Sequence, residues 1–391
     1  MFGGSHAPET ALALLYVGWI ALALALVGAA CTAVGALLIR HRFRPEQLAP
    51  RSTAPAVTVL KPLHGSHMGL EEALASALDQ DYGGPIQLVC GLQNAGDPAR
   101  LVVEQLQRRY PDRDISLIID ARIHGANRKV SNLMNMMSAA KHDLFVVADA
   151  DIAVPRNWLA TVANSLNEGG AGAATCFYTG EGRGLWSRLS AMGINYHFLP
   201  NAVFGTSFNL TRPFFGATMA LRRVVLEEIG GFGALRNCLA DDYEIGRRVR
   251  SSGYSIAYPR ILVRHDCVDA NWTDLWRHEF RWARTVRSVS AAGHWGSLTS
   301  HALPLALLGS AALGFSPVAV MALATVVLAR LFLKMGIDDI AGASAGPLWL
   351  LPLRDILSFA AFLASLAGMN VSWRGDRLRV GKDGAISQVS G

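Results

Sequence analysis

The stretch from Thr10 to Ile39 contains no charged side chain, and this feature most restricts how the chain can fold. A helix needs roughly 20 apolar residues to cross the hydrocarbon core of a bilayer, and this stretch is longer. A cleaved signal peptide fits poorly, because the residues before Thr10 include no Lys or Arg and end on Glu9. We therefore expect a membrane anchor over residues 1–39.

Basic residues follow the apolar stretch at once, in the sequence RHRFRPEQLAPR of residues 40–51. Such residues are enriched on the cytoplasmic side of membrane spans, so we expect a basic cytoplasmic linker over 40–56 and a cytoplasmic domain after it. Attraction to anionic lipid headgroups explains this positive charge and the net charge of +6. No nucleic acid partner is expected.

Residues 57–297 predict one α/β domain with a doubly wound, mostly parallel sheet, because strand-like runs alternate with helical patterns. The runs lie at 57–62, 86–92, 114–120 and 144–149, and the helical patterns at 70–81, 97–110 and 127–141. In such sheets ligands bind beyond the carboxyl ends of the strands. Near the end of this domain, residues 271–288 predict an amphipathic interface helix.

Residues 298–371 are again apolar and predict a C-terminal membrane region, followed by a basic tail at 372–391 that we expect in the cytoplasm. An even number of crossings would keep the tail on the side of the α/β domain, and two is the simplest count. Prolines and the charged residues Arg330, Lys334 and Arg354 interrupt the apolar runs, so re-entrant or interfacial helices are the alternative.

The segment LFVVADADIAVP of residues 144–155 carries Asp149 and Asp151 at the end of a buried strand. Residues two apart on an extended strand point to the same side, so these carboxylates would repel each other unless they share a cation. Hard carboxylate oxygens favour Mg²⁺ or Mn²⁺ over zinc. An Asp-rich turn with no ligand is the alternative.

Three further segments carry charged residues that a simple fold does not require. The loop HGANRK places Lys129 in the first turn of a helix, where cations oppose the helix dipole but suit a pyrophosphate. The segment CLADDYE places Asp241 and Asp242 at another helix start, and capping explains only one of them. The segment WRHEFRWARTVR puts three side chains on one helical face: His278, Arg281 and Trp282.

Six motifs occur in order along the chain: LKPLHG (60–65), DPA (97–99), NRKVSNL (127–133), DAD (149–151), ADDY (240–243) and HEFRW (278–282). In this order and spacing they resemble the membrane-bound glycosyltransferases of the ceramide-glucosyltransferase type, which have the GT-A fold. The resemblance extends from the N-terminal anchor through the C-terminal apolar region. Residues 124–133, 185–200 and 278–287 are most similar to the bacterial hopanoid-biosynthesis branch.

The resemblance implies a UDP-sugar donor, a divalent cation (Mg²⁺ or Mn²⁺) and a hopanoid or ceramide acceptor taken from the lipid bilayer. The preferred reaction is the inverting transfer of one N-acetylglucosamine from UDP-GlcNAc to a hopanoid polyol such as bacteriohopanetetrol. Transfer of glucose from UDP-glucose to ceramide is the alternative. The expected location is the bacterial inner (cytoplasmic) membrane, with several crossings and the catalytic domain facing the cytoplasm.

Carried over motif by motif, the resemblance assigns the catalytic base to Asp242 and the acceptor side to Gly216 and Asp241. Metal binding falls to Asp149 and Asp151. Contacts to the nucleotide-sugar are expected from Asp149, Lys129, His278, Arg281 and Trp282, and from Asn94 or Asp97. The family usually has an aspartate where Asn94 stands and a Gln or Arg where His278 stands.

A different class of protein also fits an α/β domain joined to apolar helices. In that interpretation the domain only binds a nucleotide and regulates a membrane transporter. The apolar segments lack the intramembrane charges expected along a transport path, which favours the enzyme.

Overall fold

The computed structural model describes residues 6–44, 54–167, 170–367, 370–373, 376–380 and 386–388. Its α/β domain is built on a seven-stranded sheet with the strand order β3-β2-β1-β4-β8-β6-β9. The strands are β1 (Val57–Pro62), β2 (Ile86–Leu92), β3 (Asp114–Ile119), β4 (Leu144–Val147), β6 (Ala171–Ala174), β8 (Met219–Arg222) and β9 (Ser255–Ala257). Strands β3, β2, β1 and β4 are parallel, and β8 runs antiparallel to β4 and β6. The predicted α/β fold with a mostly parallel sheet is confirmed.

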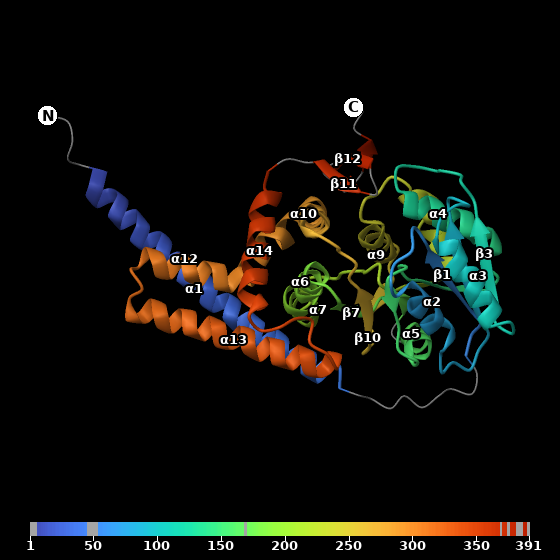
Figure 1. Cartoon of the computed structure of the whole chain (residues 1–391), viewed down its shortest axis with the longest axis horizontal. Coiled ribbons are helices and arrows are strands. Elements are labelled where there is room, and N and C mark those ends of the chain that lie inside the picture. Colours follow the sequence, from blue (N-terminus) through green and yellow to red (C-terminus); the bar gives the residue numbers. More distant parts are fainter. Residues whose placement is uncertain are drawn as a thin grey trace.

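Helices connect the strands of this sheet and cover its faces (Figure 1). They form because each carries an apolar stripe at helical spacing, as Leu70, Leu74 and Leu78 do along α2. The connecting helices are α2 (Leu70–Leu78), α3 (Ala99–Arg109), α4 (Arg128–Met136), η1 (Met137–Ala139), α5 (Trp158–Ser165), α8 (Arg223–Glu228), η3 (Phe232–Leu235) and α9 (Asp241–Ser251).

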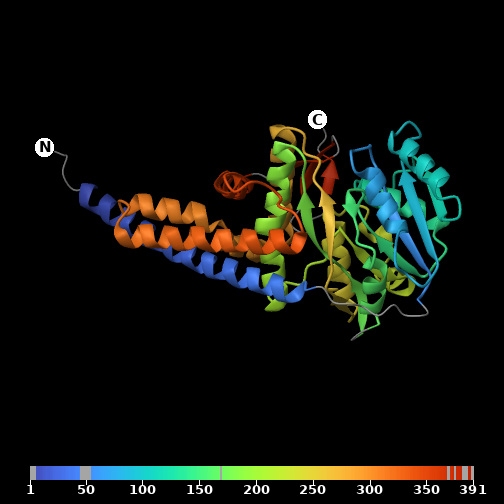
Figure 2. The same cartoon turned by 60° about the horizontal axis from the view of Figure 1, so that its bottom comes forward.

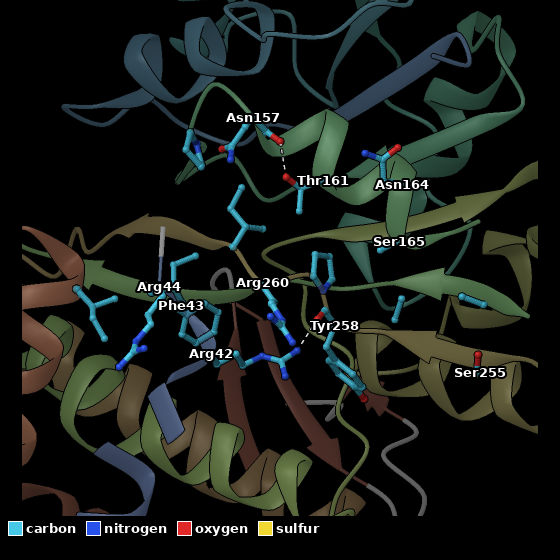
Figure 3. Close-up of a pocket in the computed structure, with 17 residues that line it drawn as sticks. Arg42, Phe43, Arg44, Asn157, Thr161, Asn164, Ser165, Ser255, Tyr258 and Arg260 are labelled. Carbon is cyan, nitrogen blue, oxygen red and sulfur yellow. Dashed lines mark hydrogen bonds between the residues drawn. The ribbon is translucent and has the colours of Figure 1, made fainter. Parts of the chain in front are cut away.

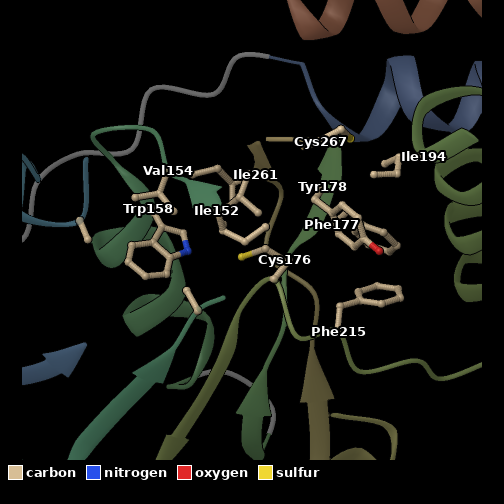
Figure 4. Close-up of a cluster of buried hydrophobic side chains, with 14 of the residues drawn as sticks. Ile152, Val154, Trp158, Cys176, Phe177, Tyr178, Ile194, Phe215, Ile261 and Cys267 are labelled. Atoms are coloured by element: carbon tan, nitrogen blue, oxygen red, sulfur yellow. The ribbon is translucent and has the colours of Figure 1, made fainter. Parts of the chain in front are cut away.

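A second sheet of three short strands lies beside the first, in the order β5-β10-β7. Its strands are β5 (Ile152–Ala153), β7 (Phe177–Glu181) and β10 (Leu262–Asp266). Buried apolar side chains pack beneath it, among them Trp158, Phe177 and Phe215 (Figure 4). Strand β5 follows directly after the Asp149–Asp151 segment, so this core fixes one end of that segment.

Two groups of helices lie outside the α/β domain, and Figures 1 and 2 show that they run in different directions. Helices α1, α12 and α13 run side by side away from the domain, whereas the axes of α6, α7, α10 and α14 run in other directions. The bounds are α1 (His6–Arg42), α6 (Leu185–Gly193), η2 (Ile194–Phe198), α7 (Leu199–Ser207), α10 (Trp272–Val289), α11 (Ala291–Gly296), η4 (Ser297–His301), α12 (Ala302–Ala312), α13 (Pro317–Ala341) and α14 (Leu350–Ser365).

Among the described residues, two helices are long and apolar enough to cross a membrane: residues 12–42 of α1, and α13. This indicates that the protein associates with a membrane. Helix α12 is shorter and pairs with α13 as an antiparallel hairpin beside α1 (Figure 2). The hairpin returns the chain to the side of the α/β domain, as an even number of crossings would.

The last turns of α1, together with Phe43 just after it, are part of the core of the α/β domain. Ala36, Ile39 and Phe43 are buried in the same apolar cluster as the central strands. A Cβ on Gly35 would lie 3.3 Å from Pro200, so α1 and α7 approach closely at this point. Earlier in the helix, Ala25 and Ala29 pack against α12 and α13 instead. The apolar run from Thr10 to Ile39 therefore has two kinds of contact, and only its last residues belong to the core of the domain.

The charged residues that interrupt the C-terminal apolar runs are buried in ion pairs. Arg330 on α13 donates to Asp355 on α14, with 3.0 Å between Nε and Oδ2. Lys334 pairs with Asp338 at 2.6 Å. Arg354 pairs with Glu279 of α10, also at 2.6 Å. Pairing is what allows charges to be buried at these positions.

The described C-terminal residues form a three-stranded antiparallel sheet of β11 (Asn370–Trp373), β12 (Asp376–Val380) and β13 (Ile386–Gln388). The backbone N–H of Ile386 donates to the carbonyl of Asn237, which lies just before α9, at 2.8 Å. The basic residues Arg374 and Lys382 of the predicted tail lie outside the described residues, as do residues 45–53 of the predicted linker.

Candidate active site

The candidate site lies where β1, β2 and β4 end at their carboxyl edge. Here Asp149 and Asp151 are not on an extended strand, because the chain turns after β4 and the N–H of Ile152 donates to the carbonyl of Asp149 at 3.2 Å. The two carboxylates therefore have different partners. Asp149 pairs with Lys129, and Asp151 pairs with His265. The prediction that both side chains share one side applied to an extended strand, and the chain turns here instead. Burial raises the pKa of Asp149, and the Asp151 carboxylate still lies close enough for its charge to raise that pKa as well.

Lys129 is the cation at the centre of the acidic cluster. Asn127 caps α4 by accepting from the N–H of Val130 at 3.0 Å, which fixes the first turn that carries Lys129. The Nζ of Lys129 lies 2.7 Å from Oδ1 of Asp149 and 3.3 Å from Oδ2 of Asp241. Burial alone would lower the pKa of Lys129, but the surrounding carboxylates outweigh it and raise that pKa. The amine is therefore held as a cation.

Asp242 lies at the start of α9, and its carboxylate accepts hydrogen bonds from two backbone N–H groups. Its Oδ2 accepts from Gly216 at 3.0 Å, and its Oδ1 accepts from Tyr243 at 2.8 Å. Burial, together with the neighbouring Asp241 carboxylate, raises the pKa of Asp242 to about 6. A carboxylate that titrates near neutral pH in a polar cluster has the properties of a general base.

Gly216 brings the backbone against the acidic cluster. A Cβ at this position would lie 2.9 Å from Oδ2 of Asp149 and 3.3 Å from Nζ of Lys129. No side chain fits there without moving the ion pair, so glycine is required for this close approach. The structure thus brings together Gly216, Lys129, Asp149, Asp241 and Asp242.

Asp151 and His265 form a second group beside the first. Nε2 of His265 lies 3.3 Å from Oδ2 of Asp151, and Nδ1 of His265 lies 3.4 Å from the Sγ of Cys267. Burial would raise the pKa of Asp151, but the positive charge of His265 outweighs it and lowers that pKa. The other oxygen of Asp151, Oδ1, is buried without a hydrogen-bond partner.

The donor set around Asp151 suits a divalent cation. A buried oxygen of Asp151 without a hydrogen-bond partner and the nearby Asp149 carboxylate are groups that such cations accept as ligands. The protonated His265 imidazole has no lone pair to offer and instead orients the Asp151 carboxylate. Among the described residues, no three His, Cys, Asp or Glu side chains converge on one point. Asp149 and Asp151 are the side chains that would hold such a cation.

Lys61 holds the turn after β4 by hydrogen bonds to its backbone, and the sequence analysis assigned this lysine no role. It is fully buried, and its Nζ donates to the carbonyls of Asp149 at 2.9 Å and Ile152 at 2.7 Å. Burial lowers its pKa to about 8. The available signal was a lysine inside the apolar run VTVLKP, because lysine is seldom fully buried without a specific partner.

Asn94 and Asp97 follow β2 at the same rim. The Oδ1 of Asn94 accepts from the N–H of Gly96 at 2.9 Å, and Asn94 is exposed. The Asp97 carboxylate accepts from the N–H groups of Gly65 and Ala99, both at 2.9 Å, and so joins the loop after β1 to the start of α3. Of the two, only Asn94 presents an exposed side chain to a ligand.

Helix α10 carries the last group of predicted residues. His278 contacts Asp269, with Nδ1 and Oδ2 3.2 Å apart, and its ring lies 4.6 Å from that of Trp282. Arg281 lies on the same helix and is partly buried. Trp282 contacts Phe198, which in turn contacts Phe215 at 5.2 Å, the residue before Gly216. An aromatic chain therefore connects α10 to the acidic cluster.

Tyr178 belongs to this aromatic chain and was also missed by the sequence reasoning. Its ring lies 4.6 Å from that of Phe198 and 6.1 Å from that of His265. Burial and the nearby Asp242 carboxylate raise the pKa of Tyr178. Its phenol is therefore neutral and lies among the acidic residues. No local sequence signal distinguished it, because a tyrosine on a strand is ordinary.

The fold resembles that of a solved glycosyltransferase. The chain superimposes on a mannosyltransferase from Pyrobaculum calidifontis, solved in complex with GDP-Man and Mn²⁺, with a TM-score of 0.51 and 21% identity over 90% of this chain and 99% of that one. At this identity the likeness shows the fold, which is GT-A. The acidic cluster lies at the carboxyl ends of the strands in this fold.

The sequence also shows the family. Residues 20–386 match the profile of glycosyl transferase family 21, and the chain therefore belongs to this family. Ceramide glucosyltransferase 3 of Caenorhabditis elegans is 25% identical over 53% of this chain and 45% of its own length. The ceramide glucosyltransferase of Komagataella phaffii is 32% identical over 35% of this chain and 29% of its own. The chain thus spans less than half of the length of these relatives.

Proposed function

We propose that the protein transfers a sugar from a UDP-sugar to a hydroxyl group of a membrane lipid, with inversion at the anomeric carbon. One observation carries this proposal. The cluster of Lys129, Asp149, Asp241 and Asp242 lies at the strand ends, and an aromatic chain joins it to α10, which packs against α14 beside the apolar helices. Packed aromatic side chains thus connect the polar cluster to helices beside the apolar ones, which supports a lipid acceptor.

For the substrates, we prefer UDP-GlcNAc as donor and a hopanoid polyol such as bacteriohopanetetrol as acceptor. The support is the resemblance of residues 124–133, 185–200 and 278–287 to the hopanoid-biosynthesis branch. UDP-glucose and ceramide are the second candidates, favoured by the two relatives that are named ceramide glucosyltransferases. Both pairs combine a charged, water-soluble donor with a lipid that carries a free hydroxyl group.

On the donor side, Asp149 and Asp151 would hold Mg²⁺ or Mn²⁺, with His265 next to Asp151. A bound divalent cation offsets the negative charge that develops on a departing diphosphate. Lys129 contributes a fixed positive charge at the same place, because three carboxylates keep its amine protonated. For Arg281 and Trp282 we propose contacts to the nucleotide-sugar, and for Asn94 a contact at the exposed rim.

On the acceptor side, Asp242 would take the proton of the attacking hydroxyl group. Inversion requires the attack to come from the face opposite the leaving group, so the base must differ from the residues that hold the diphosphate. Both Asp242 oxygens accept from backbone N–H groups, which fix the carboxylate in place while lone pairs remain for the hydroxyl group. Asp241 pairs with Lys129 and would support this geometry.

For the arrangement in the cell, we propose that residues 57–297 form the catalytic unit and face the cytoplasm of a bacterium at its inner membrane. The arginines at 40–44 and the return of the α12–α13 hairpin support this orientation. The alternative of a transporter regulated by nucleotide is disfavoured, because the charges on α13 and α14 are closed into ion pairs rather than open along a path.

The test is transfer by the purified full-length chain in phospholipid nanodiscs. Radiolabelled UDP-GlcNAc or UDP-glucose is combined with bacteriohopanetetrol or ceramide, and the label in an organic-soluble product is measured. We expect product from UDP-GlcNAc and the hopanoid. Product only from UDP-glucose and ceramide would replace our substrate assignment with the second candidate. Donor binding without any lipid product would refute the enzymatic proposal.

A further inference from the structure

A cavity of about 850 Å³ lies at the other end of strand β10 from the candidate active site. It is lined by residues at the start of β10, such as Leu262, whereas His265 lies near the end of the same strand beside Asp151. Its volume is within the range of small-molecule sites in proteins. None of the residues assigned to donor or acceptor binding lines it, so it is a separate site.

Three arginines line this cavity: Arg42, Arg44 and Arg260. Among the described residues that line it, none is acidic and no further residue is charged. Arg260 lies close enough to Arg42 for its charge to act on it, and Figure 3 shows the two guanidinium groups next to one another. Like charges repel at this distance, so the arrangement favours an anion that binds both.

Arg42 is fixed in place and still has unused hydrogen-bonding capacity. Its guanidinium stacks over the ring of Phe177 at 5.3 Å, and its Nη2 donates to the carbonyl of Tyr258. Its Nε is buried and has no hydrogen-bond partner. A buried N–H without an acceptor costs free energy that a ligand oxygen would recover. Asn164 and Ser165 add polar groups on the facing helix α5.

We propose that this arginine cavity binds a phosphate group. Arginine suits phosphate because its planar N–H groups match two oxygens at once. Two sources of such a group fit the position. The first is an anionic phospholipid headgroup, because the cavity lies at the ends of the two long apolar helices. Arg42 is the last residue of α1, and Ile340, which also lines the cavity, is next to the last residue of α13. A soluble phosphate or diphosphate is the other.

The experiment measures binding of each source to the full-length chain. Delipidated protein in neutral detergent is titrated with fluorescent short-chain phosphatidylglycerol, with the matching phosphatidylcholine, and by calorimetry with inorganic phosphate and diphosphate. Tighter binding of phosphatidylglycerol than of phosphatidylcholine identifies a lipid site. Binding of the inorganic anions with equal or greater affinity identifies a soluble ligand. If none of the anions binds, the proposal is refuted.

The arginines are tested by an Arg42→Gln, Arg260→Gln double variant. At about 1 kcal/mol for each basic residue near an anionic group, the affinity should fall about 30-fold. The control is Arg108→Gln with Arg113→Gln, which removes the same charge from exposed positions on and after α3 and should leave the affinity unchanged. An equal loss in the control, or none in the double variant, would overturn the assignment to this cavity.

Two further variants distinguish a loss of anion binding from a loss of folded protein. Arg42→Lys with Arg260→Lys keeps the charge but loses the planar N–H groups, so its affinity should lie between those of the double glutamine variant and the unmodified protein. Arg260→Gln alone leaves Arg42 on Phe177 and Tyr258 and should lower the affinity about fivefold. If the double glutamine variant unfolds and Arg260→Gln then binds as the unmodified protein does, the proposal also fails.

Discussion

Replacing Asp242 with asparagine tests the proposed base against a purely structural role. A general base contributes typically 10²–10⁴-fold to the rate, so we expect kcat to fall by about that factor. The asparagine also has a structural effect, because only one of its two polar atoms can accept from the N–H groups of Gly216 and Tyr243. An unsatisfied buried N–H costs about 1–3 kcal/mol, so the melting temperature should fall as well.

The pH profile separates these two effects. With a pKa of about 6 for Asp242, the base is ionised above that pH and is protonated as the pH falls through it. One pH unit below the pKa, about one tenth of the carboxylate is ionised, so kcat of the unmodified enzyme should fall about tenfold from its plateau. The Asp242→Asn variant should lack this limb, because an amide does not titrate. A loss of folded protein alone would leave the profile of the remaining enzyme unchanged.

The assay is the initial rate of label transfer in nanodiscs at saturating donor, measured from acidic to neutral pH on samples of known folded fraction. UDP-sugar affinity, measured by calorimetry, should change little in Asp242→Asn because the base faces the acceptor. Asp241→Asn is the matched control at the adjacent position. If Asp241→Asn is inactive while Asp242→Asn turns over normally, the assignment is off by one residue. If neither substitution matters, the mechanism is wrong.

Three further predictions follow from the same geometry. Gly216→Ala should keep the fold and lower kcat/KM by up to about 100-fold, because its Cβ displaces the Lys129–Asp149 pair. The control is Gly296→Ala, which should be active because its Cβ would meet no atom within 4 Å. A chelator should abolish transfer and added Mn²⁺ restore it, and Asp151→Ala should weaken Mn²⁺ binding measured by electron paramagnetic resonance; full activity in excess chelator would contradict the metal assignment. A cysteine at Arg44 should react with an impermeant maleimide only after cell lysis, and labelling in intact cells would reverse the proposed orientation.

The sequence predicted the elements of the fold well because their signals are local. The apolar strands before Asp149 and the amphipathic helices between them depend on spacing alone, and the structure has them at nearly the predicted bounds. The ion pair of Lys129 with Asp149 joins residues from α4 and from the turn after β4. Placing both at one rim required only the rule that parallel strands end together.

The details of the site depended on contacts that no local pattern contains. Asp149 and Asp151 have different partners at a turn that Lys61 holds, and the two carbonyl groups that accept from Lys61 lie 88 and 91 residues away in the chain. Tyr178 is among the acidic residues only because β7 packs beside β10 in the small sheet. Such long-range contacts are set by tertiary packing, and a single sequence does not encode them in a form that spacing rules can read.

The shared use of α1 determines how this protein can be divided. Ile39 and Phe43 are at most 8% exposed within the core of the catalytic domain, and burying such side chains contributes about 1.5–3 kcal/mol each. A fragment that begins at β1 would lose this helix and present an apolar groove to water. The apolar N-terminal helix is thus not separable from the domain at β1, and a water-soluble version would have to retain the last turns of α1, from about Gly35 onward.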